Sequence, residues 1–195
     1  MRTLIFATNN DNKAREIRSA LGPGWVIKTL KESGIDIDIP EPHSTLEENA
    51  REKSTVIRKL TGEDCFSEDT GLEVDSLRGE PGVRSARYAG EHRGFEANIE
   101  KLLANLEKSD SRKARFRTVI SFMQGSQEHQ FEGVCNGIII AEKRGEGGFG
   151  YDPIFVPDGD TRTFAEMSMA DKNRFSHRKK ALDKLIHFLQ KDSNL

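Results

Sequence analysis

Apolar positions along the chain fall into short continuous runs and helically spaced sets. The runs at residues 4–7, 25–30, 64–67 and 72–77 predict buried strands. Two longer β-rich stretches, 114–123 and 129–141, are joined near Gly125 and predict a further pair of strands. Helical spacing predicts helices over 13–21, from Ser44 or Thr45 to Thr61–Gly62, over 96–106 and over 177–190. Because these elements do not alternate strictly, we expect an α/β fold with a mixed sheet flanked by helices.

Local signals support the limits of these elements. Gly22 is placed to end the first helix, and Thr45 with Glu48 fits a capping box at the start of the second. A turn is expected over 79–82 around Pro81, and residues 144–150 form a glycine-rich loop. With no internal repeat or linker, residues 1–195 are predicted to form one domain.

Composition narrows the classes of function. The chain is 35% hydrophobic and 32% charged, which is typical of a soluble protein with a core. Its net charge of -2 argues against a nucleic-acid partner, although basic residues cluster at 112–117 and 174–180. Cys65 and Cys135 lie far apart, which favours reduced thiols in the cytoplasm. The amino-terminal apolar run is too short for a signal peptide and no run approaches a membrane span, so no membrane partner is expected.

A polar segment follows the first predicted strand and opens the first predicted helix. Its residues are Thr8, Asn9, Asn10, Asp11, Asn12 and Lys13. A strand, a tight turn and a helix start make an anion site, because first-turn N–H groups and the helix dipole favour negative charge. Asparagine tolerates left-handed backbone and donates hydrogen bonds, and Lys13 adds a charge suited to phosphate. The alternative is plain helix capping by Asp11 or Asn12, with Lys13 in solvent.

Carboxylates recur through the first half of the chain. They are Glu41, Glu47, Glu48, Glu68, Asp69 and Asp75. Residues 67–71 are predicted to lie where a strand ends in a turn, a common place for functional groups. Mg²⁺ takes one or two carboxylates together with phosphate oxygens and water, so this pattern favours a metal–polyphosphate substrate. One carboxylate could orient or deprotonate an attacking water. The alternative is that Asp69 caps a turn, Glu48 caps a helix and Glu41 is only exposed.

Six ordered motifs resemble the inosine triphosphate pyrophosphatase family, whose bacterial members are dITP/XTP pyrophosphatases. They are residues 8–13 (TNNDNK), 45–50 (TLEENA) with Lys53, 67–75 (SEDTGLEVD), 81–83 (PGV) with 85–88 (SARY), 147–153 (GGFGYDP) and 176–178 (SHR). The similarity runs from about residue 4 to residue 189. It implies a homodimer of elongated mixed α/β subunits, each with two lobes and a central cleft. It also implies Mg²⁺-dependent hydrolysis of ITP, dITP and XTP to the monophosphate and pyrophosphate, which removes damaged purines from the nucleotide pool.

The resemblance also assigns roles to individual residues. The loop 8–13 would hold the triphosphate, with Lys13 a catalytic cation, Lys53 and Thr70 at the phosphates, Asp69 as base and metal ligand, and Glu41 as a second metal ligand. The nucleoside would be held by Phe149, Gly150, Tyr151, Asp152, Lys172, His177 and Arg178. Thr70 stands where serine is usual, and Asn9 where glycine is frequent. The alignment at Glu41 crosses a variable stretch, which leaves Glu47 or Glu48 as alternative metal partners.

The predicted base site explains one kind of selectivity. Hypoxanthine and xanthine present a 6-oxo acceptor where adenine presents an amino donor. Arg178 and Lys172 are obligate donors and His177 can donate, so donors aimed at that position would reject adenine. Guanine also carries a 6-oxo group, so this device does not exclude GTP. Taken without the resemblance, Phe149 reads as a core aromatic and Ser176–Arg178 as a helix cap followed by solvated residues.

Two other functions remain open at this point. One is a related pyrophosphatase that acts on modified pyrimidines or on several ordinary nucleotides. The other is a nucleotide-sensing module that binds without turnover.

Overall fold

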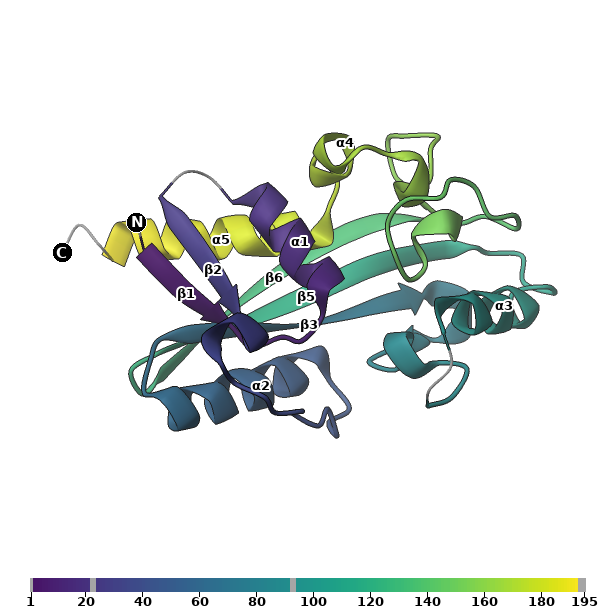
Figure 1. Cartoon of the computed structure of the whole chain (residues 1–195). Coiled ribbons are helices and arrows are strands. Elements are labelled where there is room, and N and C mark those ends of the chain that lie inside the picture. The colour runs from purple at the N-terminus through teal and green to yellow at the C-terminus, as the bar shows by residue number, and fades with distance from the viewer. Residues whose placement is uncertain (1, 22–23, 92–93, 193–195) are drawn as a thin grey trace. The chain divides into compact units, whose positions relative to one another are not determined.

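The computed structural model describes residues 2–21, 24–91 and 94–192 and contains a mixed sheet with helices on it. The strands are β1 (Arg2–Phe6), β2 (Trp25–Thr29), β3 (Cys65–Val74), β4 (Pro81–Gly82), β5 (Lys113–Gln124), β6 (Gln127–Ile139) and β7 (Phe155–Pro157). The α-helices are α1 (Asp11–Ala20), α2 (Leu46–Thr61), α3 (Phe95–Asn105), α4 (Met169–Asn173) and α5 (His177–Asp192). The strand order is β2-β1-β3-β5-β6-β7, with β4 paired to β3 (Figure 1). Because β1 pairs in parallel with β2 and β3 while β4 and β7 are antiparallel, the predicted mixed α/β sheet is confirmed.

The chain divides into two compact units, and β3 passes from one to the other after Asp69. Unit 1 comprises Met1–Asp69, Thr118–Gly133 and Arg178–Leu195. Unit 2 comprises Thr70–Arg117 and Val134–His177.

In unit 1 the sheet is covered on both faces, with α2 on one face and α1 and α5 on the other (Figure 1). Side chains of successive strand residues point to opposite faces. On β1, Leu4 and Phe6 therefore pack toward α1 and α5, while Ile5 and Ala7 pack with Ile57 of α2. The same alternation applies to β3, which decides where its functional side chains point.

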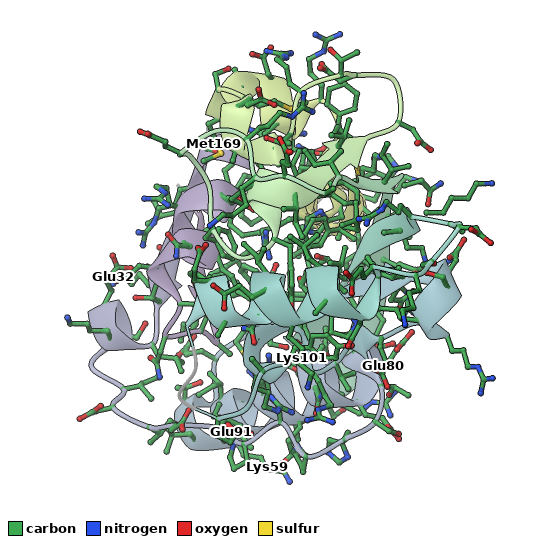
Figure 2. The ribbon with its side chains drawn as sticks, turned by 90° about the vertical axis from the view of Figure 1, so that its right-hand side faces the viewer. Glu32, Lys59, Glu80, Glu91, Lys101 and Met169 are labelled. Carbon is green, nitrogen blue, oxygen red and sulfur yellow. The ribbon has the colours of Figure 1, made fainter. Side chains whose placement is uncertain are left out.

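Unit 2 has its own apolar core, in which strand residues pack against α3 and the segment that precedes α4. Buried Tyr88 is tied to this core by polar groups at its edge. Its hydroxyl donates to Glu80 Oε2 at 2.9 Å, and Lys101 of α3 donates to the Tyr88 carbonyl oxygen at 2.6 Å. Figure 2 labels Glu80 and Lys101, the two residues that bond to Tyr88.

The main correction to the predicted elements concerns β3. The strands expected over 64–67 and 72–77 are one continuous strand that ends at Val74, and residues 75–77 form a 3-10 turn. The turn expected over 67–71 is therefore wrong. Gly71 has a structural reason within the strand: a Cβ there would lie 2.7 Å from the Gly82 carbonyl oxygen, so glycine lets β4 pair closely with β3.

Other limits differ by smaller amounts. The predicted helix from Thr45 to Thr61 is confirmed, with Thr45 accepting a hydrogen bond from the Glu48 N–H. Helix α1 begins earlier than expected, at Asp11, and Gly22 lies outside the described residues. β7, α4 and the short 3-10 turns between 152 and 166 were not predicted, because they are too short to show a period.

The structure can also be compared with the predictions about the two cysteines and about membrane spans. Cys65 and Cys135 are both buried and neither is in a disulfide within the described residues, and burial raises the pKa of Cys65 to about 12. Within the described ranges, no helix is both long and apolar enough to cross a bilayer.

Candidate functional site

The loop between β1 and α1 lies at the carboxyl end of a parallel strand, beside β3. Ala7 N–H donates to the Phe66 carbonyl oxygen at 2.7 Å, which fixes the loop next to the first residues of β3. Asn10 is the helix cap, since its Oδ1 accepts from the Lys13 N–H at 3.1 Å, and Thr8 Oγ1 accepts from the Asn10 N–H at 3.1 Å. This edge of a parallel pair is where α/β sheets bind ligands.

The asparagines of this loop work through their side chains rather than through left-handed backbone. Among the described residues, Arg78 is the one non-glycine residue with a positive φ, so the left-handed turn expected of the asparagines is wrong. Asn9 instead donates to the Ile37 carbonyl oxygen at 2.9 Å, and Asn12 accepts from Arg15 at 2.6 Å. The cap is Asn10, so the alternative of capping by Asp11 or Asn12 is also wrong. The first-turn N–H groups that these bonds leave for an anion are those of Asp11 and Asn12.

A buried ionic network lies on the α1 and α5 face of β3. Glu68 is 2% exposed and accepts two hydrogen bonds from Arg178, from Nε at 2.7 Å and from Nη2 at 2.9 Å. Arg178 Nη1 also donates to buried Glu16 of α1. The Lys13 ammonium lies 3.2 Å from Glu68 Oε1. Lys13 is therefore held near the loop by a carboxylate, not left in solvent as the capping alternative supposed.

The charges of this network decide which of its groups stay ionised. Burial opposes the charge on Glu68, but Arg178 and Lys13 outweigh that penalty and lower its pKa to about 2. The two carboxylates in turn raise the pKa of Arg178 above its usual value, although burial acts in the opposite direction. Glu68 and Arg178 thus stay ionised at any pH near neutrality.

We expect this arrangement to make stability depend on acid pH. A carboxyl whose pKa is lowered by folding stabilises the protein above its unfolded pKa of about 4.3, and that stabilisation disappears as the pH falls toward the folded value. The free energy of unfolding should therefore fall by on the order of 3 kcal/mol between pH about 4.5 and about 2 because of Glu68. Urea unfolding across this range measures it.

Glu68→Gln should flatten that acid slope, whereas Glu91→Gln, at a carboxylate with a 74% exposed side chain, should leave it as in the wild type. An unchanged slope in Glu68→Gln would show that the network does not control acid stability.

A second cluster lies on the α2 face of β3, because Asp69 follows Glu68 and points the opposite way. Lys53 of α2 is an ion-pair partner of Glu41 Oε1 and lies 3.9 Å from Asp69 Oδ1. Asn49, one helical turn earlier, donates to Asp69 Oδ2 at 3.2 Å. Glu41 is therefore paired rather than merely exposed. Asp69 lies within a strand rather than capping a turn.

These side chains fit the ligand set of Mg²⁺. The ion takes one or two carboxylates and fills its other positions with phosphate oxygens and water. Glu41 and Asp69 supply two carboxylates around one ammonium, whereas Glu48 bonds to Thr45 at the start of α2. Within the described residues there is no group of three or more His, Cys, Asp or Glu side chains that could hold a metal ion.

In unit 2, the glycine-rich loop and α4 bring together an aromatic ring and a buried ion pair. The Lys172 ammonium lies 2.6 Å from Asp152 Oδ2, and both side chains are at most 5% exposed. Asp152 Oδ2 also accepts from the Phe149 N–H at 2.9 Å, and Lys172 Nζ lies 5.5 Å from the Phe149 ring centre. A Cβ at Gly148 would lie 2.1 Å from Asp152 Oδ2, so only glycine admits this carboxylate. The predicted residues 149, 152 and 172 thus form one contact group.

The other predicted nucleoside residues have different surroundings. His177 is 3% exposed and stacks on Phe116 with ring centres 4.7 Å apart, so it is not a solvated residue. Tyr151 is buried and donates to the Ser85 carbonyl oxygen at 2.9 Å, and burial raises its pKa. Thr70 is half-buried in β3, directly after Asp69.

Sequence reasoning did not assign a role to Asn49 or Glu16, and it named Glu68 without a partner. Asn49 stands four residues before Lys53, and this helical spacing was the one available signal that the two share a face. Nothing local indicates that Glu16 and Glu68 meet Arg178, because 162 and 110 residues separate them from it.

Comparisons with known proteins place this chain among similar sequences and folds. A dITP/XTP pyrophosphatase of Christiangramia forsetii is 48% identical over 188 residues, which cover 96% of this chain and 99% of the relative. One of Porphyromonas gingivalis is 50% identical over 190 residues, covering 97% of this chain and 98% of the relative. The solved structure of the Staphylococcus aureus Ham1 protein has a TM-score of 0.88 and 40% identity, and covers 98% of this chain and 100% of that chain. The model of the Ham1 family matches residues 4–188, and the chain belongs to this family.

Proposed function

We propose that this chain is a nucleoside-triphosphate pyrophosphatase that converts ITP, dITP and XTP to the monophosphate and pyrophosphate, with Mg²⁺ as cofactor. The names of its relatives support the reaction and the purine class. The observation that carries the proposal is the Lys53 ammonium between the Glu41 and Asp69 carboxylates. That pair of acids with a cation between them suits a polyphosphate that brings its own metal.

Glu41 and Asp69 would hold the Mg²⁺, which when bound would neutralise charge on the leaving pyrophosphate. The chain supplies further positive groups of its own. Lys53, which lies beside both acids, would neutralise charge on the phosphate oxygens. Lys13 and the first-turn N–H groups of Asp11 and Asn12 would bind phosphate at the start of α1.

The proposed chemical step is one displacement at the α-phosphorus. The oxygen of a water molecule forms a bond to this phosphorus and gives a proton to Asp69. The bond from the phosphorus to the bridging oxygen breaks, and pyrophosphate leaves with the bonding electrons. The support for this role is that Asp69 carries a carboxylate beside the Lys53 ammonium, 3.9 Å from Oδ1, with Oδ2 accepting a hydrogen bond from Asn49.

Within unit 2, we propose that Phe149 stacks on the purine and that Lys172 and His177 donate to its 6-oxo group. Lys172 is an obligate donor whose position is set by Asp152. An adenine amino group would meet these donors as a donor and would leave buried groups unpaired. We also propose that the enzyme is a cytoplasmic homodimer. Light scattering, which measures molar mass in solution, would test the dimer.

A substrate panel tests the proposed function. Pyrophosphate release would be measured for ITP, dITP, XTP, GTP, ATP and dTTP, with Mg²⁺ and with excess chelator. We expect kcat/KM for ITP, dITP and XTP to exceed that for ATP by at least about 10²-fold, and chelator to abolish release.

Three results would contradict this expectation. Preference for dTTP, or equal rates on all nucleotides, would favour a pyrophosphatase of other specificity. Nucleotide binding without pyrophosphate release would favour a sensing module.

A further inference from the structure

Asn49 is a completely buried amide on the face of α2 that meets β3. Its exposed fraction is 0%. Its Oδ1 accepts from the His43 N–H at 2.9 Å, and its Nδ2 donates both to the His43 carbonyl oxygen at 3.2 Å and to Asp69 Oδ2 at 3.2 Å. Both donors and the acceptor of this side chain are thus used. A buried amide so fully bonded is costly to remove and holds its partners in one arrangement.

The partners of Asn49 lead to both carboxylates of the proposed metal site. Asp69 is bonded directly. His43 lies two residues after Glu41, so the two bonds to the His43 backbone fix the chain that carries Glu41. Lys53, four residues further along the same helix, contacts both acids, at Glu41 Oε1 and at Asp69 Oδ1. One helical face therefore sets where both acids lie.

The bond to Asp69 also makes its two carboxylate oxygens different. Oδ2 accepts from Asn49, while Oδ1 faces the Lys53 ammonium. A carboxylate held in this way cannot rotate freely, so Oδ1 of Asp69 stays directed toward the Lys53 ammonium. Residues that hydrogen-bond to a metal-ligating carboxylate commonly change metal affinity by 10- to 100-fold when they are mutated.

We infer that Asn49 is a positioning residue that fixes the Asp69 carboxylate relative to Glu41, and thereby sets metal affinity and turnover. This inference rests on the proposed function, because it assigns Asn49 to the same metal–nucleotide site. Asn49 does not reach substrate in this account and acts through the two acids.

The test uses two variants of Asn49 and one control in the full chain. Asn49→Leu keeps the side-chain size and removes all three hydrogen bonds. Asn49→Asp keeps the shape and the bond from the His43 N–H, but places a second carboxylate against Asp69. Ser54→Ala is the matched control: Ser54 is equally buried on α2, but its hydroxyl bonds to the Arg51 carbonyl oxygen and to Ser121.

Three measurements separate positioning from plain stability. Thermal unfolding gives Tm, electron paramagnetic resonance gives the Kd of Mn²⁺ in the presence of α,β-methylene-ITP, and steady-state assays with ITP and Mg²⁺ give kcat and KM. For Asn49→Leu we expect Mn²⁺ binding to weaken by about 10-fold and kcat to fall by about 10²-fold, with KM for ITP changed by less than about 3-fold. Ser54→Ala should lose Tm but keep Mn²⁺ affinity and kcat within about 2-fold.

Asn49→Asp keeps the inference testable if the leucine variant does not fold. The aspartate lacks the amide donor to Asp69 and to the His43 carbonyl oxygen, so kcat should fall by about 10-fold while KM for ITP changes by less than about 3-fold.

The outcomes distinguish the inference from the function on which it rests. If the wild type neither binds the Mn²⁺–analogue pair nor releases pyrophosphate, the proposed function fails. If the wild type does both and the Asn49 variants keep its Mn²⁺ affinity and kcat, the inference is overturned. Equal losses in Ser54→Ala would also overturn it, because they would show a general effect of polar groups buried under α2.

Discussion

Asp69→Asn is expected to lower kcat for pyrophosphate release from ITP by about 10³-fold, with nucleotide binding changed by less than about 3-fold. The substitution keeps the shape of the side chain, so the bond from Asn49 and the packing of β3 should survive. It removes the negative charge that would face the metal and the oxygen that would accept the proton from water. A positioned base typically contributes 10²- to 10⁴-fold, which sets the expected loss. Steady-state assays and equilibrium binding of α,β-methylene-ITP measure the two effects.

Asp75→Asn provides a control at another acid of the same motif. Asp75 is exposed in the 3-10 turn after β3, outside the cluster around Asp69. Its replacement should leave kcat within about 2-fold. Turnover of Asp69→Asn close to the wild-type value would rule out Asp69 as base and metal ligand, while an equal loss in both variants would point to the motif's stability instead.

Arg178→Ala is expected to lower the free energy of unfolding by about 3 to 5 kcal/mol. Arg178 is 2% exposed, and its removal leaves the buried carboxylates of Glu68 and Glu16 without their main cation. Removal of one partner from a buried ionic group costs this much because burial prevents water from solvating the charge that remains. Urea unfolding at pH 7 measures it. Arg178→Lys should lose less, because it keeps a charge while giving up the two-pronged contact with Glu68.

A loss below about 1 kcal/mol in Arg178→Ala would contradict this account of the network. Glu16→Gln, measured alone and combined with Arg178→Ala, gives a second check. The losses in free energy of unfolding should not add up in the double variant, because the two residues belong to one network.

The same network bears on how selectivity should be tested. Arg178 was predicted to donate to the base, but in the structure its Nε, Nη1 and Nη2 atoms all have carboxylate partners. A changed ITP-to-ATP ratio in Arg178→Ala would therefore mix recognition with loss of folding. His177→Ala leaves those ion pairs in place and is the cleaner variant for the donor hypothesis.

The region around β3 shows how far local patterns reach. The sequence pattern predicted strands before and after Gly71, but it split one strand into two and extended the second part past Val74. Polar residues 67–70 and a glycine are typical of a turn, because an isolated strand seldom carries three such groups in its buried middle. They are tolerated here because Ser67, Glu68 and Asp69 each meet a partner on the face where they point.

The loop after β1 gives a second case. Its position between a strand and a helix was evident from the order of apolar and polar residues. The use of its asparagines was not, because Asn9 bonds to a carbonyl group 28 residues away. Side chains whose hydrogen-bond partners lie far away in the sequence leave no recognisable pattern in the residues around them.

By itself, the sequence determined the mixed α/β class, the long helices, the hairpin of β5 and β6, and the family resemblance. These depend on short-range periodicity and on ordered motifs, both of which are written along the chain. Tertiary structure alone decided which partners each acid meets: Glu68 contacts Lys13 and Arg178, and Asp69 contacts Asn49 and Lys53. The physical reason is that alternation along a strand assigns opposite faces to neighbours, but only packing shows which helix covers each face.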